Sequence, residues 1–316
     1  MLTPTPNIKV FYEPVVKPHS TGLYDTRNTL TSIPFAVANS DAGRQRYTDD
    51  GVILVGDVFS RTEIDAARAC LAAMTRDDAP RCEAIWYEGN IRDRLGLDAT
   101  RDHGAASGRL SDPFALGQEA KALPDLPPPE RARYVRKLMG FLDTNPALHA
   151  IAYHPRLLQL VRAALGGAAP KLFQEMAMIK PPGGREKPWH QDHAYFNLEL
   201  DERIVGIWIP LEAATQENGC MVALRGAHKA GPRPHFRLRD WQLCDADVGE
   251  DSRVALPMQP GEVMLFDGKL PHGTATNRTE DFRWAIQFHY VAAAARETSD
   301  DVRLAAFGAE GKNVTC

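Results

Sequence analysis

The sequence lacks the features that would mark a nucleic-acid-binding or a membrane protein. It has no basic excess, since 37 Lys and Arg stand against 41 Asp and Glu and the formal net charge is −4. Such a chain has no general surplus of cations to neutralise phosphates. Its longest apolar run, residues 204–211, is far shorter than a membrane span. We therefore expect a small-molecule ligand, with no nucleic acid and no membrane as partner.

Cysteine is scarce and shows no pairing pattern. The five cysteines are odd in number, widely spaced and without a Cys-x-x-Cys pair: Cys70, Cys82, Cys220, Cys244 and Cys316. This usage predicts reduced thiols in a cytoplasmic protein and argues against a disulfide framework or a zinc site. The first residues also lack a basic segment followed by an apolar one, so we expect no secretory signal.

The 316 residues are 44% hydrophobic and 25% charged, which is typical of a globular protein. That length suits one large domain or two small ones. We interpret residues 1–316 as a single domain. Within it we expect an N-terminal arm (1–45), a helical flank with a lid (46–170) and a β-rich core (171–295), followed by a short strand or frayed tail.

Helical signals concentrate in the first half of the chain. Ser60 and Glu63 have the spacing of a capping box, and apolar residues then recur at helical intervals to about residue 75. We predict further helices near 131–143 and over 145–167, the second broken by His-Pro and ended by Gly-Gly. Residues 77–130 show no clear period, and we expect them to form part of a lid.

From about residue 171 the chain changes to short β-rich segments separated by Pro and Gly. The candidate strands are 171–180, 203–211, 219–224, 253–258, 261–267 and 282–292. Short strands with this punctuation predict a sandwich or barrel.

A metal-binding pattern lies within this β-rich half. In an extended strand, residues i and i+2 point to the same side, so His190 and Asp192 can aim an imidazole and a carboxylate at one point. His272 follows 82 residues after His190. Two imidazoles and one carboxylate with open positions are the usual coordination of non-haem iron(II) oxygenases. His-x-Asp alone is weak evidence, because ten histidines give about one such match by chance.

Arg283 strengthens the pattern. It lies 11 residues after His272, at the start of a predicted strand. A guanidinium in a partly dry pocket offers a fork to a carboxylate, here the distal carboxylate of 2-oxoglutarate, worth about 1.5–3 kcal/mol. The order His-x-Asp, a hairpin-like unit at 218–229, then His and Arg is far more specific than any single part.

Over residues 46–292 the chain resembles the phytanoyl-CoA dioxygenase family. The carriers of the resemblance are WHQDHAYF (189–196), ENGCM and GAHK (217–229), and GEVMLFDGKLPHGTATN with the arginine that follows (261–283). The resemblance implies a mainly β fold with flanking helices, a double-stranded β-helix of the jelly-roll, cupin-like kind.

The resemblance also implies the site and the reaction. Iron(II) would be held by His190, Asp192 and His272, and 2-oxoglutarate by Arg283, with Thr274, Trp208 and Gln174 as further contacts. The implied enzyme is a dioxygenase that uses O2, hydroxylates a C–H bond of a small metabolite and releases succinate and CO2. Related halogenases have a small residue in place of the carboxylate, so Asp192 favours hydroxylation. We expect the metabolite to bear a carboxylate.

Other interpretations remain open. A cupin-type metal enzyme that does not use 2-oxoglutarate would have no need of Arg283, and a non-catalytic jelly-roll binding protein would not need all three metal ligands. Desaturation, ring formation or demethylation would use the same cofactors. Monomer and homodimer both fit the composition.

Several residues near the motifs receive ordinary structural roles. We expect solvated surface charge for Lys180, Arg185, Lys187, Arg225, Lys229 and Arg233, at the mouth of the site. Trp86, Tyr195 and Phe196 could line the pocket, but we expect them to pack in the core. For His193, His228, His235 and His289 we expect either support of the metal ligands from behind or a structural role.

Overall fold

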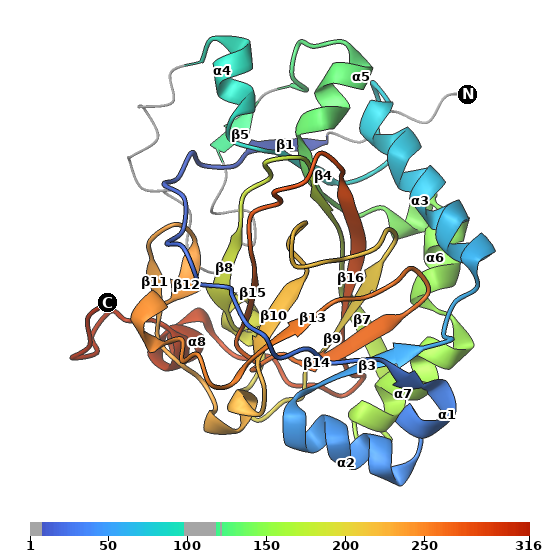
Figure 1. The fold of residues 1–316 in the computed structure, drawn as a ribbon, viewed down its shortest axis with the longest axis vertical. Helices are drawn as coiled ribbons and strands as arrows, with labels where there is room; N and C mark the ends of the chain where they lie inside the picture. The colour runs from blue at the N-terminus through green and yellow to red at the C-terminus, as the bar shows by residue number, and fades with distance from the viewer. Residues whose placement is uncertain (1–7, 98–117, 121) are drawn as a thin grey trace.

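The computed structural model describes residues 8–97, 118–120 and 122–316, and it is built around two β-sheets (Figure 1). The larger sheet has the strand order β2-β3-β14-β9-β16-β7-β6-β4-β1-β5. Its strands are β1 (Lys9–Tyr12), β2 (Ile33–Pro34), β3 (Val52–Gly56), β4 (Ala84–Tyr87), β5 (Gln118–Ala120), β6 (Val135–Met139), β7 (Pro170–Lys180), β9 (Val205–Pro210), β14 (Val263–Asp267) and β16 (Arg283–Ala292).

The smaller sheet has the order β13-β10-β15-β8. Its strands are β8 (Lys187–His190), β10 (Met221–Leu224), β13 (Arg253–Leu256) and β15 (His272–Thr274). Together with β7, β16, β9 and β14 of the larger sheet, these strands form the two four-stranded faces of a jelly roll. The predicted double-stranded β-helix is confirmed. The segment expected as a helical flank also supplies β3, β4, β5 and β6, which extend the larger sheet.

The larger sheet is covered on both faces, so its central strands are buried except at the last residues of β14 and β16. In β16, Trp284 and Ile286 pack into the outer apolar cluster with the helices, while Ala285 packs into the inner cluster between the sheets. Successive side chains of a strand point to opposite faces. Arg283 has the same parity as Ala285, so it points into the space between the two sheets.

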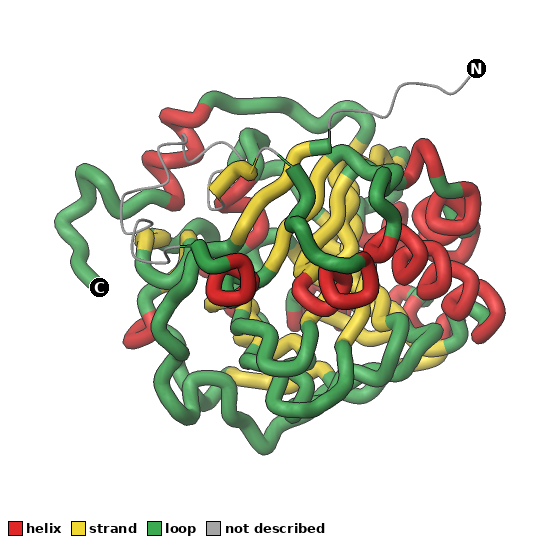
Figure 2. Tube along the Cα trace, turned by 90° about the horizontal axis from the view of Figure 1, so that it is seen from above, coloured by secondary structure: helices red, strands yellow, loops and turns green. Residues whose placement is uncertain are grey.

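Helices cover the outer face of the larger sheet. The helices of the described residues are α1 (Phe35–Ala38), α2 (Asp41–Asp50), α3 (Arg61–Arg76), α4 (Ile91–Leu95), α5 (Pro128–Arg131), α6 (Pro146–Ala152), α7 (Pro155–Ala164) and α8 (Asp300–Phe307). Figure 1 shows α1, α3, α6 and α7 along one side of the molecule, α4 and α5 at the top, α2 at the bottom and α8 on the other side, near the C-terminus; in Figure 2 the densest group of helices again lies on one side of the strands. Within the described ranges, no helix is long and apolar enough to cross a membrane.

The predicted start of α3 is confirmed. The Ser60 hydroxyl accepts from the Glu63 backbone N–H, and the Glu63 side chain accepts from the Ser60 backbone N–H. Every fourth or third residue along α3 is buried against the sheet, as the apolar period predicted. The break between α6 and α7 at His154-Pro155 is also confirmed. Of the expected lid (77–130), residues 98–117 and 121 lie outside the described residues, and the described part contains β4, α4, β5 and α5.

Three local predictions are wrong. Residues 131–143 do not form one helix. They contain the 3-10 turn η2 (Ala132–Tyr134), β6 and the start of the 3-10 turn η3 (Leu142–Thr144), because residues 135–139 pair with β4 and β7. The tail contains a helix, α8, whose N-cap is Ser299. Residues 218–229 are no hairpin, since β10 pairs with β13 and β15 and is followed by the turn η5 (Ala227–Ala230).

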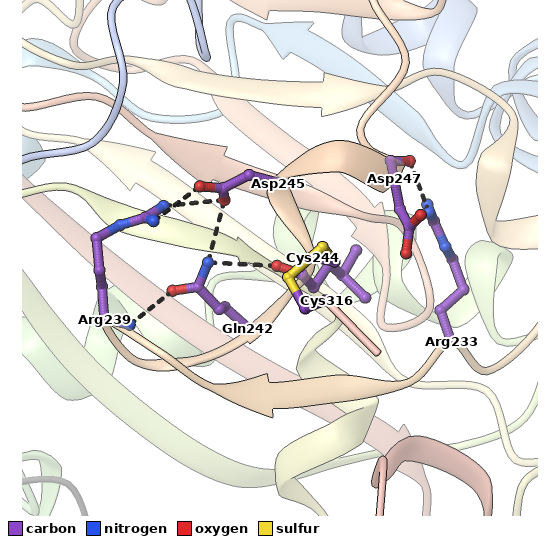
Figure 3. Close-up of a disulfide and its surroundings, with 8 residues drawn as sticks. Arg233, Arg239, Gln242, Cys244, Asp245, Asp247 and Cys316 are labelled. Carbon is purple, nitrogen blue, oxygen red and sulfur yellow. Dashed lines mark hydrogen bonds and ion pairs between the residues drawn. A yellow bond between two sulfur atoms is a disulfide. The ribbon is translucent and has the colours of Figure 1, made fainter. Parts of the chain in front are cut away.

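The expectation of five reduced thiols is wrong for one pair. Cys244 and Cys316 form a disulfide with their Cα atoms 5.3 Å apart, whereas Cys70, Cys82 and Cys220 are free. Figure 3 shows the bridge beside Asp245, which binds the Arg239 guanidinium in a bidentate ion pair. The two cysteines are 72 residues apart, so no local spacing pattern could reveal the pairing. The bridge fixes the end of the chain to the turn η6 (Asp245–Asp247).

Candidate active site

Three buried side chains converge between the two sheets. His190 ends β8, His272 begins β15, and the two residues are paired across the ladder between these strands. Asp192 lies just beyond β8, in the 3-10 turn η4 (Asp192–Tyr195), so a turn and not a continuous strand brings it to the histidines. One ligand atom from each residue lies within 4.8 Å of the others.

The hydrogen bonds of both histidines define which nitrogen faces the centre. The Nδ1 atoms lie 2.7 Å from the Pro188 carbonyl oxygen and 2.9 Å from the Leu270 carbonyl oxygen. A carbonyl only accepts, so Nδ1 carries the proton in each neutral ring and Nε2 keeps its lone pair. Burial, with a contribution from His190, lowers the pKa of His272 to about 4, which keeps that ring neutral at neutral pH.

The Nε2 atoms of His190 and His272 lie 3.1 and 3.6 Å from Oδ1 of Asp192. Burial alone would raise the pKa of Asp192, but the neighbouring His272 and His289 hold it well below its usual range. Two imidazole lone pairs and a carboxylate oxygen therefore face one another, and they need a cation between them. This donor set, with no other ligand atom among the described residues, fits a divalent metal such as iron(II).

Two side chains hold the second oxygen of Asp192: His289, for which a supporting or structural role was expected, and Gln287, which the sequence analysis did not assign. The Oδ2 atom lies 2.8 Å from Nε2 of His289 and 3.2 Å from Nε2 of Gln287. Both residues are buried on β16. The contacts occupy Oδ2 and leave Oδ1 as the oxygen that faces the histidines. His289 thus supports a metal ligand, which is one of the two roles that we expected for it.

A signal for these residues was present in the sequence. Gln287 and His289 lie four and six positions after Arg283 in a predicted strand, so all three share one face. If Arg283 faces the pocket, Gln287 and His289 therefore face it too. On β7, Gln174 and Lys180 are separated by an even number of positions, and both line the pocket.

The other end of the pocket offers hydrogen-bond donors. Arg283 is buried, and its Nη1 donates to the Gly219 carbonyl oxygen at 3.1 Å, while its Nε has no partner. Burial lowers the pKa of Arg283 to about 10, so the guanidinium stays charged at neutral pH. Among the described residues no carboxylate lies within 4.0 Å of it. A buried cation of this kind needs an anionic partner.

The other predicted co-substrate residues line the same pocket. The Arg283 Cζ atom lies 5.2 Å from the centre of the Trp208 ring. Gln174 pairs with His289 across β7 and β16, and its Oε1 is buried without a partner. Thr274, at the end of β15, receives a hydrogen bond from Lys180. The structure thus brings together Arg283, Thr274, Trp208 and Gln174 with the metal ligands.

The outer part of the pocket is built from residues for which core packing or surface exposure was expected. Trp86, Tyr195 and Phe196 all line it. The Lys137 Nζ lies 4.0 Å from the centre of the Trp86 ring. Lys187 donates to Oδ2 of Asp240 at 2.7 Å and to the Tyr195 hydroxyl at 3.1 Å, so it is a pocket residue and not a solvated one.

The other basic residues expected at the mouth behave differently from one another. Lys180 is buried inside the pocket. Arg185 lies beside the pocket and pairs with Asp240 at 3.3 Å. The remaining three make contacts elsewhere: Arg225 pairs with Asp50, Lys229 with Asp49, and Arg233 donates to the Asp247 carbonyl oxygen.

The turn that carries Asp192 is supported from outside by other predicted structural histidines and by α8. The Gln191 backbone N–H donates to Nε2 of His235 at 3.0 Å. His193 lies against the Phe307 ring of α8. Arg303, fully buried on α8, donates to the Ala194 carbonyl oxygen at 2.6 Å. His228 instead lies at the surface near Thr48.

Comparison with known proteins connects this arrangement to a family. The family model for Phytanoyl-CoA dioxygenase (PhyH) matches residues 47–285. The chain is 31% identical over 171 residues to a probable phytanoyl-CoA dioxygenase of Caenorhabditis elegans, covering 49% of this chain and 54% of that protein. It is 25% identical to phytanoyl-CoA dioxygenase domain-containing protein 1 of Danio rerio, over 79% of this chain and 89% of that protein.

Solved structures show the same fold. EvdO2 from Micromonospora carbonacea var. aurantiaca, complexed with 2-oxoglutarate, superimposes with a TM-score of 0.55. The two sequences are 22% identical, and the match covers 86% of this chain and 96% of EvdO2. At this identity the likeness establishes the architecture.

Proposed function

Because the chain belongs to the phytanoyl-CoA dioxygenase (PhyH) family of iron(II)- and 2-oxoglutarate-dependent oxygenases, we propose that it hydroxylates a C–H bond of a small, carboxylate-bearing metabolite. The enzyme is a 2-oxoglutarate-dependent non-haem iron oxygenase with the facial triad His190, Asp192 and His272. Iron(II), 2-oxoglutarate and O2 supply the oxidising chemistry, in which substrate, 2-oxoglutarate and O2 give alcohol, succinate and CO2.

The chain's own residues would bind and orient the reactants. His190 and His272 present their Nε2 lone pairs because backbone carbonyls hold their Nδ1 protons. Asp192 presents Oδ1 because His289 and Gln287 engage Oδ2. A carboxylate at position 192 occupies a coordination site that halide would need, which supports oxygenation over halogenation.

Arg283 would bind the distal carboxylate of 2-oxoglutarate, with Thr274 as a second donor. Its unpartnered Nε and its burial support this role. Trp208 would pack against the guanidinium and the carbon chain of the co-substrate, and the free Oε1 of Gln174 would accept a hydrogen bond within the pocket. The 2-oxo acid end of the molecule would then point toward the triad.

The charge of the pocket carries the proposal for the substrate. Among the described residues, five cationic side chains and three carboxylates line it: Arg136, Lys137, Lys180, Lys187 and Arg283 against Glu13, Asp192 and Asp240. Arg136 is also paired with the buried Glu88 at 2.9 Å. Iron(II) and the 2-oxoglutarate dianion cancel each other, so a surplus of one positive charge remains. Trp86, Met176 and Phe196 offer apolar surface for the body of the molecule. A small anionic substrate would balance that surplus.

The experiment is a screen for succinate release with carboxylic acids and their neutral primary amides as matched pairs. The proposal expects acids to raise succinate formation and their amides to raise it far less, with a product 16 mass units heavier than the substrate, the mass of one oxygen atom. Equal stimulation by acid and amide would contradict the anionic substrate. A product lighter than the substrate by two hydrogen atoms would show that the reaction is desaturation and not hydroxylation.

We propose that residues 1–316 act as one domain, as a monomer or a homodimer in the cytoplasm. The first 45 residues and residues 46–170 add strands to the same sheet that carries the core, which supports a single unit. The three free cysteines support a reducing compartment such as the cytoplasm. The Cys244–Cys316 bridge, in contrast, is typical of oxidising compartments. A bridge that persists in freshly alkylated cell extract would contradict the cytoplasmic assignment.

A further inference from the structure

Two buried cations face each other in the donor end of the pocket. Lys180 of β7 and Arg283 of β16 are directly opposite across the antiparallel ladder, and each is 2% exposed. Side chains of opposite residues lie on the same face, and like charges in this position are destabilising. Burial and the facing Arg283 lower the pKa of Lys180 well below its usual value. Within the described ranges no carboxylate lies within 4.0 Å of either residue. The pair therefore needs an anion that the protein does not supply, and such an anion favours the ammonium form of Lys180.

The hydrogen bonds of Thr274 show what Lys180 does there. The Thr274 Oγ1 accepts from Nζ of Lys180 at 2.7 Å and from the backbone N–H of Lys187 at 3.3 Å. A hydroxyl oxygen has two lone pairs and one proton. Both lone pairs are engaged, so the proton is left to donate to something else. An ammonium group is a donor only, and it cannot take that proton.

We propose that Lys180 is a positioning residue, which holds the Thr274 hydroxyl so that its proton is donated to the distal carboxylate of 2-oxoglutarate, and which thereby makes the enzyme select a dianionic 2-oxo acid. This inference rests on the proposed binding of 2-oxoglutarate by Arg283. It adds a residue that acts through Thr274 and through its own charge.

The structure offers a reason why a lysine suits this position. Lys180 also donates to the Ala275 carbonyl oxygen, so its ammonium group is held between two acceptors on the end of β15. Turning away would cost the group its hydrogen bonds to the Thr274 hydroxyl and to the partly buried Ala275 carbonyl oxygen. Arg283 and Thr274 then offer only hydrogen-bond donors to the far end of the bound acid. A neutral or apolar chain end would leave these donors unpaired and would bind more weakly.

The test compares two ligands that differ only at the far end. 2-Oxoglutarate carries a carboxylate there, and 2-oxopentanoate carries a methyl group on the same five-carbon chain. Binding is measured anaerobically on the iron(II)-loaded full chain from the visible absorption of the complex. The variants are Lys180→Met, Thr274→Val and the double variant. Lys171→Met is the matched control, because Lys171 is an exposed lysine of the same strand.

Lys180→Met is expected to weaken 2-oxoglutarate binding about 10- to 100-fold, the loss of a charge-assisted hydrogen bond. Binding of 2-oxopentanoate and of iron(II) should stay within about twofold of wild type, as should every property of Lys171→Met. Thr274→Val should lower the same preference. In the Lys180→Met background it should cost much less than alone, because the two residues act as one unit.

An unchanged ratio of the two affinities in Lys180→Met would overturn the inference, as would additive losses in the double variant. If Lys180→Met fails to fold, Thr274→Val tests the inference instead. A Thr274→Val enzyme that still prefers 2-oxoglutarate to 2-oxopentanoate as strongly as wild type would overturn it. A wild-type enzyme that binds iron(II) but neither acid would instead refute the proposed function. The two failures are therefore distinguishable.

Discussion

The two ends of the pocket have opposite hydrogen-bonding chemistry. At one end, His190, His272 and Asp192 present only acceptor atoms to a common point. At the other, Arg283 and Lys180 present only donors, and no described carboxylate answers them. The first end needs a cation and the second an anion. One molecule, a 2-oxo diacid that chelates the cation and extends its far carboxylate to the donors, satisfies both.

The largest effect is expected from breaking the acceptor end. Asp192→Ala removes the one carboxylate of the triad and leaves two neutral imidazoles, so iron(II) affinity should fall by at least about 100-fold and succinate formation should stop. The iron content that remains after anaerobic gel filtration measures iron(II) binding, and a succinate assay measures turnover. Asp201→Ala, which removes an exposed ion pair with Arg296, is the control. Full iron content in Asp192→Ala would show that the metal lies elsewhere.

A smaller effect should follow from loosening the acceptor end without removing a ligand. His289→Phe deletes the 2.8 Å contact to Oδ2 of Asp192 and keeps a ring of similar shape. Loss of such a supporting contact typically costs about 10- to 100-fold in metal affinity. Competition with a coloured chelator measures that loss. If the metal affinity and the melting temperature of the variant both equal those of wild type, His289 is not needed to orient Asp192.

Much of this contrast could be predicted from the sequence, for identifiable reasons. The ligands and Arg283 lie in local motifs, and the period of two in β16 fixes which side chains share the pocket face. Lys180 was placed at the mouth because charge usually means surface. Its burial depends on pairing between β7 and β16, which join residues over 100 positions apart. The Cys244–Cys316 bridge and the packing of α8 on the turn of Asp192 depend on such contacts too.

Lys137 tests whether a buried positive charge in the outer part of the pocket also lowers the stability of the protein. Burial lowers the pKa of Lys137 from 10.5 to about 8, so its charged form costs stability below pH 8. That cost disappears as the pH rises from 8 to 10.5, because only the unfolded chain then still binds the proton. Lys137→Met should be more stable than wild type by about 1–3 kcal/mol at pH 7, since the side chain is partly exposed and lies over Trp86.

Urea unfolding at pH 7 and at pH 9.5 measures this difference, which should shrink at the higher pH. A gap that stays constant between the two pH values would show that the lysine is not under this strain. A less stable variant at both values would show that the contact with the Trp86 ring outweighs the burial of the charge.

The smallest effect on the pocket is expected from the disulfide. Cys316→Ser frees the end of the chain but leaves Arg303 and Phe307 in contact with the turn of Asp192. The melting temperature should fall by several degrees, corresponding to about 2–4 kcal/mol, and iron affinity should not change. Wild type in reducing buffer should match the variant. A loss of iron affinity would show that the bridge itself supports the acceptor end.

The central claim is that one diacid spans the two ends of the pocket. Anaerobic titration of the iron(II)-loaded protein with 2-oxoglutarate tests it most directly, by the weak visible absorption band that the chelate gives, in wild type and in Arg283→Ala. We predict a band in both proteins, with the variant needing at least about tenfold more 2-oxoglutarate. Iron(II) that binds without a band at any 2-oxoglutarate concentration, or a band equally easy to form in both proteins, would contradict the account.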